Sequence, residues 1–158
     1  MSQIKLYTIA QGLEYAKAYC AREERCQSQV IEKLLKYGLS IEESEICIGE
    51  LICEGYINEQ RYADLFAVSK FHQNKWGKTK IAYELKLKRI TSSCISKALD
   101  KIDYDEYLSL IEEIFSKKYF SIPKEKKIKA KKSFDYLLGK GFAYNDIVEA
   151  IKDKGYDF

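Results

Sequence analysis

GYINEQRYADLFAVSKFHQNKWGKTKIAYELKLKRI, residues 55–90, predicts two helices joined by a tight turn at Lys75-Trp76-Gly77. Residues at helical spacing stand on both sides of the turn: Tyr62, Leu65, Phe66, Ser69, Ile81 and Leu85. Between Phe66 and Ile90 the stretch holds seven Lys and Arg residues, and its only acidic residue there is Glu84. This balance indicates a surface that binds a negatively charged partner or docks in a groove, and the stretch does not resemble a catalytic site.

The composition predicts a soluble, charge-rich helical protein. The chain has 158 residues, of which 46% are apolar and 32% charged. A single proline and eight glycines argue against a sheet-rich fold with many tight turns. No run of apolar residues is long enough for a membrane span, and the first residues do not resemble a secretory signal. We therefore expect a cytoplasmic protein.

The cysteine and histidine content predicts no metal site. The five cysteines form no CxxC pair, and His72 is the only histidine. We expect reduced thiols that pack as small apolar residues, and His72 on a helix surface. With no glycine-rich phosphate loop and no nucleophile–base pair in view, we expect neither a cofactor nor an enzyme.

Charge is distributed unevenly along the chain. Residues 1–54 carry a net charge of −3, residues 55–102 a net charge of +6, and residues 103–158 no net charge. Within the last segment, residues 117–140 hold nine lysines against Glu125 and Asp135. Two basic regions on a balanced chain suggest contact with a polyanion or an acidic protein surface, and a solvated helix face remains the alternative.

A repeat of 51 to 52 residues organises the sequence. Aligning residues 30–40, 81–91 and 133–143 superposes three apolar sets: Leu34, Leu85 and Leu137; Leu39, Ile90 and Phe142; and, further on, Ile48, Leu99 and Ile151. We therefore predict an all-α fold of three tandem three-helix repeats in an elongated, curved array. The predicted limits are an N-terminal segment at 1–11 and repeats at 12–55, 56–102 and 103–158.

Helix-end signals support these units. Gly38 predicts a left-handed C-cap, and Ser40 with Glu43 predicts a capping box at the start of the third helix. In the third repeat, Pro123 is expected in the first turn of a helix that begins with the lysine run 124–132.

Three ordered blocks resemble the RecX family of bacterial regulators of the RecA recombinase. The first block contains Ala21, Arg22, Glu23, Glu24, Arg25, Cys26, Val30, Lys33 and Leu34. The second is Gly55, Tyr56, Ile57, Asn58, Glu59, Gln60, Arg61, Tyr62 and Ala63, and the third contains Gly77, Ile81, Glu84, Leu85, Lys88, Arg89 and Ile90. The resemblance extends over about residues 12–153. Cys26 replaces the family's serine, and Arg89 replaces its glycine, so the helix end at Arg89 is expected to be capped differently.

The resemblance implies a non-enzymatic regulator that binds RecA and its nucleoprotein filament. Such proteins limit filament extension, ATPase activity, strand exchange and coprotease activity, and they act in DNA repair and the SOS response. It also implies that a basic face meets the filament, and we expect a monomer without cofactors. The alternative is a helical protein that binds single- or double-stranded DNA directly.

The residues expected at the filament form two patches. The central patch consists of Lys70, Lys75, Lys78, Lys80, Lys88 and Arg89, and the second patch consists of Lys124, Lys126, Lys127, Lys131 and Lys132. Two roles remain open for Arg61: contact with the partner, or a structural pairing with Glu59 or with a nearby helix end. Trp76 is expected to cover the turn, with partner contact as the alternative.

Overall fold

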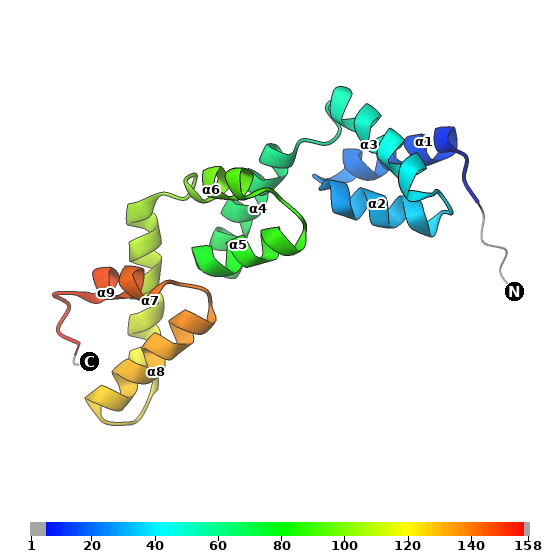
Figure 1. Cartoon of the computed structure of the whole chain (residues 1–158). Coiled ribbons are helices and arrows are strands. Elements are labelled where there is room, and N and C mark those ends of the chain that lie inside the picture. The colour runs from blue at the N-terminus through cyan, green and yellow to red at the C-terminus, as the bar shows by residue number, and fades with distance from the viewer. Residues whose placement is uncertain (1–5, 157–158) are drawn as a thin grey trace, which may run out of the picture.

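A computed structural model describes residues 6–156, and these residues form nine α-helices and no strand (Figure 1). The helices are α1 Ile9–Arg22, α2 Gln27–Lys36, α3 Ile41–Cys53, α4 Glu59–Asn74, α5 Lys78–Leu87, α6 Ser92–Leu99, α7 Tyr104–Ser121, α8 Lys126–Gly139 and α9 Tyr144–Ile151. The tight turn predicted at Lys75-Trp76-Gly77 joins α4 to α5.

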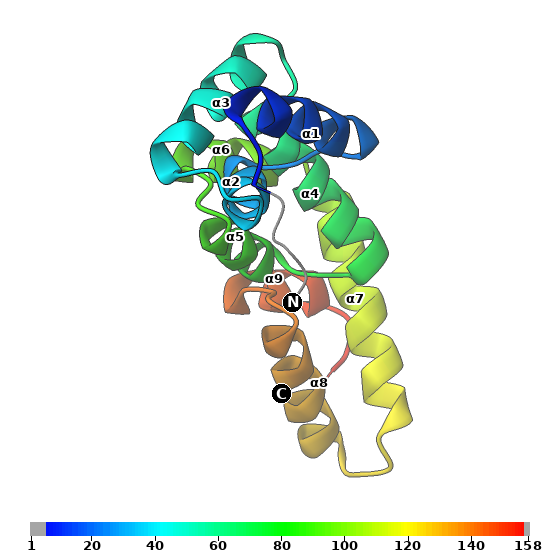
Figure 2. The same cartoon turned by 90° about the vertical axis from the view of Figure 1, so that its right-hand side faces the viewer.

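The helices pack in three consecutive groups of three, here called unit 1 (α1–α3), unit 2 (α4–α6) and unit 3 (α7–α9). Units 1 and 3 lie at opposite ends of the molecule with unit 2 between them, and the array is elongated and curved (Figures 1 and 2). The predicted all-α class with three three-helix repeats is thus confirmed. The limits proposed for the individual repeats stay predictions.

The repeated apolar positions occupy the interior of each unit. Leu34, Leu85 and Leu137 are fully buried at corresponding places on α2, α5 and α8. Of the other aligned residues, Leu99 is half-buried and packs against the core, and the rest are buried: Leu39, Ile90, Phe142, Ile48 and Ile151. The sequence repeat therefore arises from packing, because each small bundle needs large apolar side chains at the same interior positions.

The second helix of every unit ends with the same backbone conformation. Gly38, Arg89 and Gly141 have φ values of 87°, 61° and 90°. Each donates its N–H to the carbonyl three residues earlier, and the next residue donates to the carbonyl five residues before it. The expectation of a different cap at Arg89 is therefore wrong: the arginine adopts the left-handed conformation that glycine adopts in units 1 and 3.

Two further helix-end predictions have opposite outcomes. The capping box at α3 is confirmed, since Ser40 Oγ accepts from Glu43 N at 3.1 Å and Glu43 Oε2 accepts from Ser40 N at 2.8 Å. Pro123 lies before α8 and not in its first turn, because α8 begins at Lys126 with Glu125 at its N-cap. The link between α7 and α8 is longer than the break predicted at the proline.

Two hydrophobic cores divide the molecule unequally. One core lies within unit 1 and its link to unit 2. The other is continuous through units 2 and 3, and Tyr107 of α7 joins its two parts. The fully buried Tyr107 ring lies 5.7 Å from the ring of Phe71 in unit 2 and 5.4 Å from that of Phe142 in unit 3. Units 2 and 3 therefore share one apolar interior.

The backbones of units 2 and 3 also meet directly, where the α4–α5 turn lies against the α8–α9 turn. Gly77 N donates to Lys140 O at 2.9 Å, and Thr79 N donates to Gly141 O at 3.0 Å. The Lys78 N–H donates to the Tyr107 hydroxyl at 2.9 Å. A Cβ on Gly77 would lie 2.2 Å from the carbonyl carbon of Gly141, so only glycine permits this approach.

We predict that Gly77→Ala lowers the free energy of unfolding by about 3 kcal/mol, because the added methyl group meets backbone that cannot move aside. Gly139→Ala is the matched control, since a Cβ there meets nothing within 4 Å. Urea unfolding followed by circular dichroism and by fluorescence of the adjacent Trp76 measures both variants. Equal stability of the two variants would contradict the close contact.

We predict that Arg89→Gly raises the free energy of unfolding by about 1 kcal/mol, because the left-handed conformation costs a residue with a Cβ about that much. The same urea titration measures it. Lys86→Gly, in the last turn of α5 three residues earlier, should instead lower the free energy of unfolding by up to about 1 kcal/mol. A destabilised Arg89→Gly would show that the arginine side chain holds the helix end.

Candidate functional site

Three lysines of the central patch gather on a pair of aromatic rings. Phe66 of α4 and Trp76 of the turn lie edge to face with ring centroids 6.5 Å apart. Lys70 Nζ is 5.5 Å from the Phe66 centroid and 5.1 Å from that of Trp76, and Lys80 Nζ is 4.5 Å from Trp76. Lys88 Nζ is 5.9 Å from Phe66. The half-buried Trp76 thus covers the turn and also supports two ammonium groups.

The remaining central-patch residues, Lys75, Lys78 and Arg89, lie away from the Phe66 and Trp76 rings. Lys75 is the left-handed C-cap of α4, and its Nζ lies 3.8 Å from the carboxylate of Glu113 on α7. Lys78 Nζ is 5.0 Å from the buried Tyr107 ring. Arg89 is exposed at the end of α5. The structure therefore brings Lys70, Lys80 and Lys88 together and places Lys75 and Lys78 at the boundary with unit 3.

Most central-patch charges have no carboxylate partner within residues 6–156. Among the ion pairs of residues 6–156, Lys75 alone of the six has a carboxylate partner. The other five are Lys70, Lys78, Lys80, Lys88 and Arg89. Four of these, all but Arg89, place their ammonium nitrogens within 6 Å of an aromatic ring centroid, which positions the charge without a carboxylate partner among the described residues.

The second patch lies on α8 and on the link before it. All five of its lysines are exposed. Lys124 precedes the helix, and Lys127 and Lys131 line a shallow hollow beside the rings of Phe134 and Tyr144, whose centroids are 4.9 Å apart. The exposed lysines of this patch thus have an aromatic border at Phe134 and Tyr144.

A lysine-lined hollow between units 2 and 3 contains residues that sequence reasoning did not select. It has a volume of about 310 Å³, and its wall includes Lys75, Lys117, Lys118 and Lys140 together with Tyr136. Only Lys75 was assigned to a patch. The lysine-rich segment 117–140 signalled the region, but the meeting of Lys75 with Lys140 depends on the contact between the two turns.

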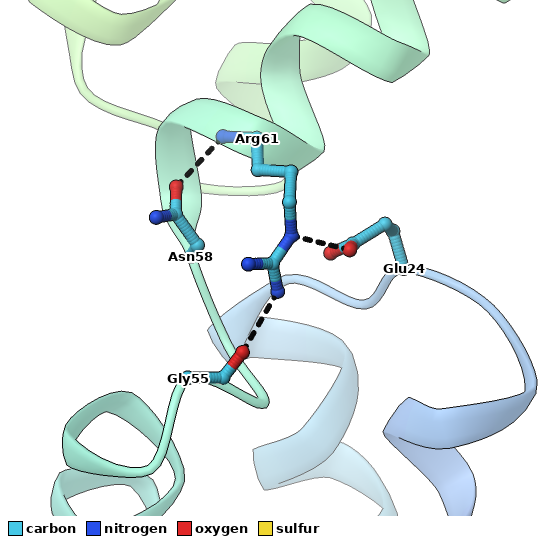
Figure 3. Close-up of polar contacts among 4 residues, drawn as sticks. All are labelled: Glu24, Gly55, Asn58 and Arg61. Carbon is cyan, nitrogen blue, oxygen red and sulfur yellow. Dashed lines mark hydrogen bonds and ion pairs between the residues drawn. The ribbon is translucent and has the colours of Figure 1, made fainter.

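Arg61 joins unit 1 to unit 2 (Figure 3). Its Nε forms an ion pair with Glu24 in the α1–α2 loop, and a terminal guanidinium nitrogen donates to Gly55 O at 3.0 Å. The Asn58 side chain accepts from Arg61 N at 2.8 Å and caps α4. The role is structural, but the partner is Glu24; Glu59 accepts instead from Thr91 N at 3.2 Å.

The described residues present no arrangement typical of acid–base or metal chemistry. His72 is exposed and hydrogen-bonds Glu106 at 2.8 Å. Burial raises the pKa of Tyr107 to about 12, which keeps its hydroxyl protonated as an acceptor for Lys78 N. Within residues 6–156, no three Cys, His, Asp or Glu side chains form a group that could hold a metal ion. None of the helices in that range is long and apolar enough to cross a membrane.

The fold and surface define a class: a helical array of three-helix units that exposes basic side chains on successive units. A family model described as RecX, second three-helix domain, matches residues 58–99, which correspond to α4–α6. The crystal structure of RecX from Lactobacillus salivarius has a TM-score of 0.84, with 23% identity over 92% of this chain and 95% of that one.

Two relatives, each called Regulatory protein RecX, extend the similarity along the chain. The Acinetobacter baylyi protein is 30% identical over 137 residues, which cover 86% of this chain and 83% of the relative. The Clostridium acetobutylicum protein is 29% identical over 137 residues, covering 84% of this chain and 57% of the relative's own length. The chain belongs to the RecX family.

We predict that Arg61→Met loosens the junction between units 1 and 2 while leaving each unit folded. Loss of a partly exposed ion pair and its carbonyl bond should cost about 1 kcal/mol, which raises amide exchange in residues 23–28 and 55–58 about fivefold. Hydrogen–deuterium exchange with mass spectrometry measures the effect.

The matched control for this variant is Lys36→Met, which removes an exposed pair with Glu32 inside α2. It should leave exchange in both junction segments unchanged. Unchanged exchange in Arg61→Met, or an equal rise in α7–α9, would contradict the assignment of Arg61 to the junction.

Proposed function

We propose that this protein is a non-enzymatic regulator that binds RecA and its nucleoprotein filament and limits filament extension, ATPase activity, strand exchange and coprotease activity. The observation that carries the proposal is membership in the RecX family, with similarity that reaches all three units. Both relatives described above are called Regulatory protein RecX, a name that denotes a regulatory role.

The distribution of charge supports this proposal. Unpaired cationic side chains lie on unit 2, and further exposed lysines lie on α8 of unit 3. An elongated array that carries such groups on successive units gains affinity by several weak contacts to neighbouring copies in a filament. Each contact alone contributes little, because exposed charges are screened by salt.

The aromatic support under the central patch also favours binding to an acidic partner. The half-buried Lys70 and Lys80 side chains rest against Trp76, so they lose less side-chain entropy on binding than free lysines lose. We therefore infer that Lys70, Lys80 and Lys88 form the centre of the filament contact, with Arg89 at its edge. We expect the second patch to contribute more weakly, because its lysines are exposed to solvent.

We predict that Lys80→Glu with Lys88→Glu raises at least fivefold the protein concentration needed to inhibit RecA-dependent ATP hydrolysis on single-stranded DNA. Reversal at Lys127 and Lys131 should produce a smaller increase, because these exposed lysines belong to the second patch, which is expected to contribute more weakly. Reversal at the exposed Lys97 and Lys101 changes net charge equally outside both patches and is the control. Circular dichroism checks that each variant is folded.

The outcomes of this assay separate the candidates. Full inhibition by both patch variants would show that the patches are wrongly assigned. If the native protein neither inhibits ATP hydrolysis nor co-sediments with RecA filaments, the proposed function fails. Salt-dependent binding to DNA in the absence of RecA would instead favour the alternative of a direct DNA-binding protein.

A further inference from the structure

The lysine-lined hollow holds two separate pairs of ammonium groups. Lys117 Nζ and Lys75 Nζ lie 2.7 and 3.8 Å from the same oxygen of Glu113, so these two nitrogens are close neighbours. Lys118 Nζ and Lys140 Nζ lie 4.8 and 5.9 Å from the Tyr136 ring centroid. Tyr136 is therefore the common support of the second pair.

The two pairs line a single hollow because the contact between the α4–α5 turn and the α8–α9 turn brings Lys75 of unit 2 to the lysines of unit 3. Lys140 Nζ donates to Asn74 O at 3.4 Å, which places it beside Lys75, the next residue along the chain. No acidic residue is part of the wall, and Glu113 is the neighbouring carboxylate that pairs with two of the lysines. The ammonium groups of Lys117 and Lys75 lower the pKa of Glu113, as expected beside concentrated positive charge.

We propose that this hollow binds a ligand that carries two or more linked phosphate groups. A single small anion can contact only part of this set of ammonium groups, whereas linked phosphates can contact groups spread over the hollow. The volume of about 310 Å³ lies at the lower end of the range for small-molecule sites. Lysine ammonium groups suit phosphate oxygens as point charges with three donors each.

The phosphates, rather than an attached base, are the recognised part. The Tyr136 ring already contacts two ammonium groups, so the hollow presents charge and not a free stacking face. Inorganic tripolyphosphate and the triphosphate of ATP share the required chemistry. Both should bind, with dissociation constants within about threefold of each other if the base adds little.

Isothermal titration calorimetry of the full chain with sodium tripolyphosphate tests the proposal. Lys118→Gln with Lys140→Gln should weaken binding at least about tenfold, because one ammonium pair is lost. Glu113→Gln should tighten it about fivefold, because the competing carboxylate is removed. Lys97→Gln with Lys101→Gln has the same change in net charge outside the hollow and should bind like the native chain.

Three results would overturn the proposal: no saturable binding, an equal loss in the Lys97 and Lys101 control, or unchanged binding in Glu113→Gln. A parallel titration with a thymidine oligonucleotide tests whether the hollow binds a nucleic-acid backbone instead of a polyphosphate. If Lys118 and Lys140 matter only for the oligonucleotide, the hollow is a contact for a nucleic-acid backbone and not a polyphosphate site. The measurements need no RecA, so their result is independent of the proposed function.

Discussion

The approach of the α4–α5 turn to the α8–α9 turn is the contact on which the arrangement of units 2 and 3 depends. The backbone N–H groups of Gly77 and Thr79 donate to the carbonyls of Lys140 and Gly141, so the backbones of the two turns are in direct contact. Buried backbone groups that lost these partners would be costly, so the two units cannot separate without opening both the hydrogen bonds and the shared core around Tyr107. We therefore expect units 2 and 3 to move together.

Unit 1 is joined to units 2 and 3 by a different kind of contact. Its own core is separate, and its connection relies on the Arg61–Glu24 pair and a bond from Ser28 Oγ to Lys88 O at 2.9 Å. Among the described residues that precede α4, Cys26 alone belongs to the larger core. Because a few polar bonds yield more easily than a packed interior, any change in curvature of the array is expected between units 1 and 2.

The repeat and its helix ends were predictable because they depend on neighbours in sequence. Leu34, Leu85 and Leu137 recur with the period, and Ser40 with Glu43 caps locally. Arg89 escaped prediction because its left-handed backbone is imposed by the repeated packing of Ile90 against local preference. Within the candidate site, the basic stretch was visible, whereas the meeting of Lys75 with Lys140 requires two turns distant in sequence to touch.

The placement of lysine ammonium groups beside aromatic rings links the fold to its charge. The ammonium groups of Lys70 and Lys80 lie beside the Trp76 ring, and attraction to the ring favours this position for both charges. Helix α4 and the turn beside Gly77 therefore shape the interior and orient the external charges at the same time. A substitution that disturbs the turn is expected to weaken the proposed binding to an acidic partner even if every lysine were kept, because the charges would lose their common support.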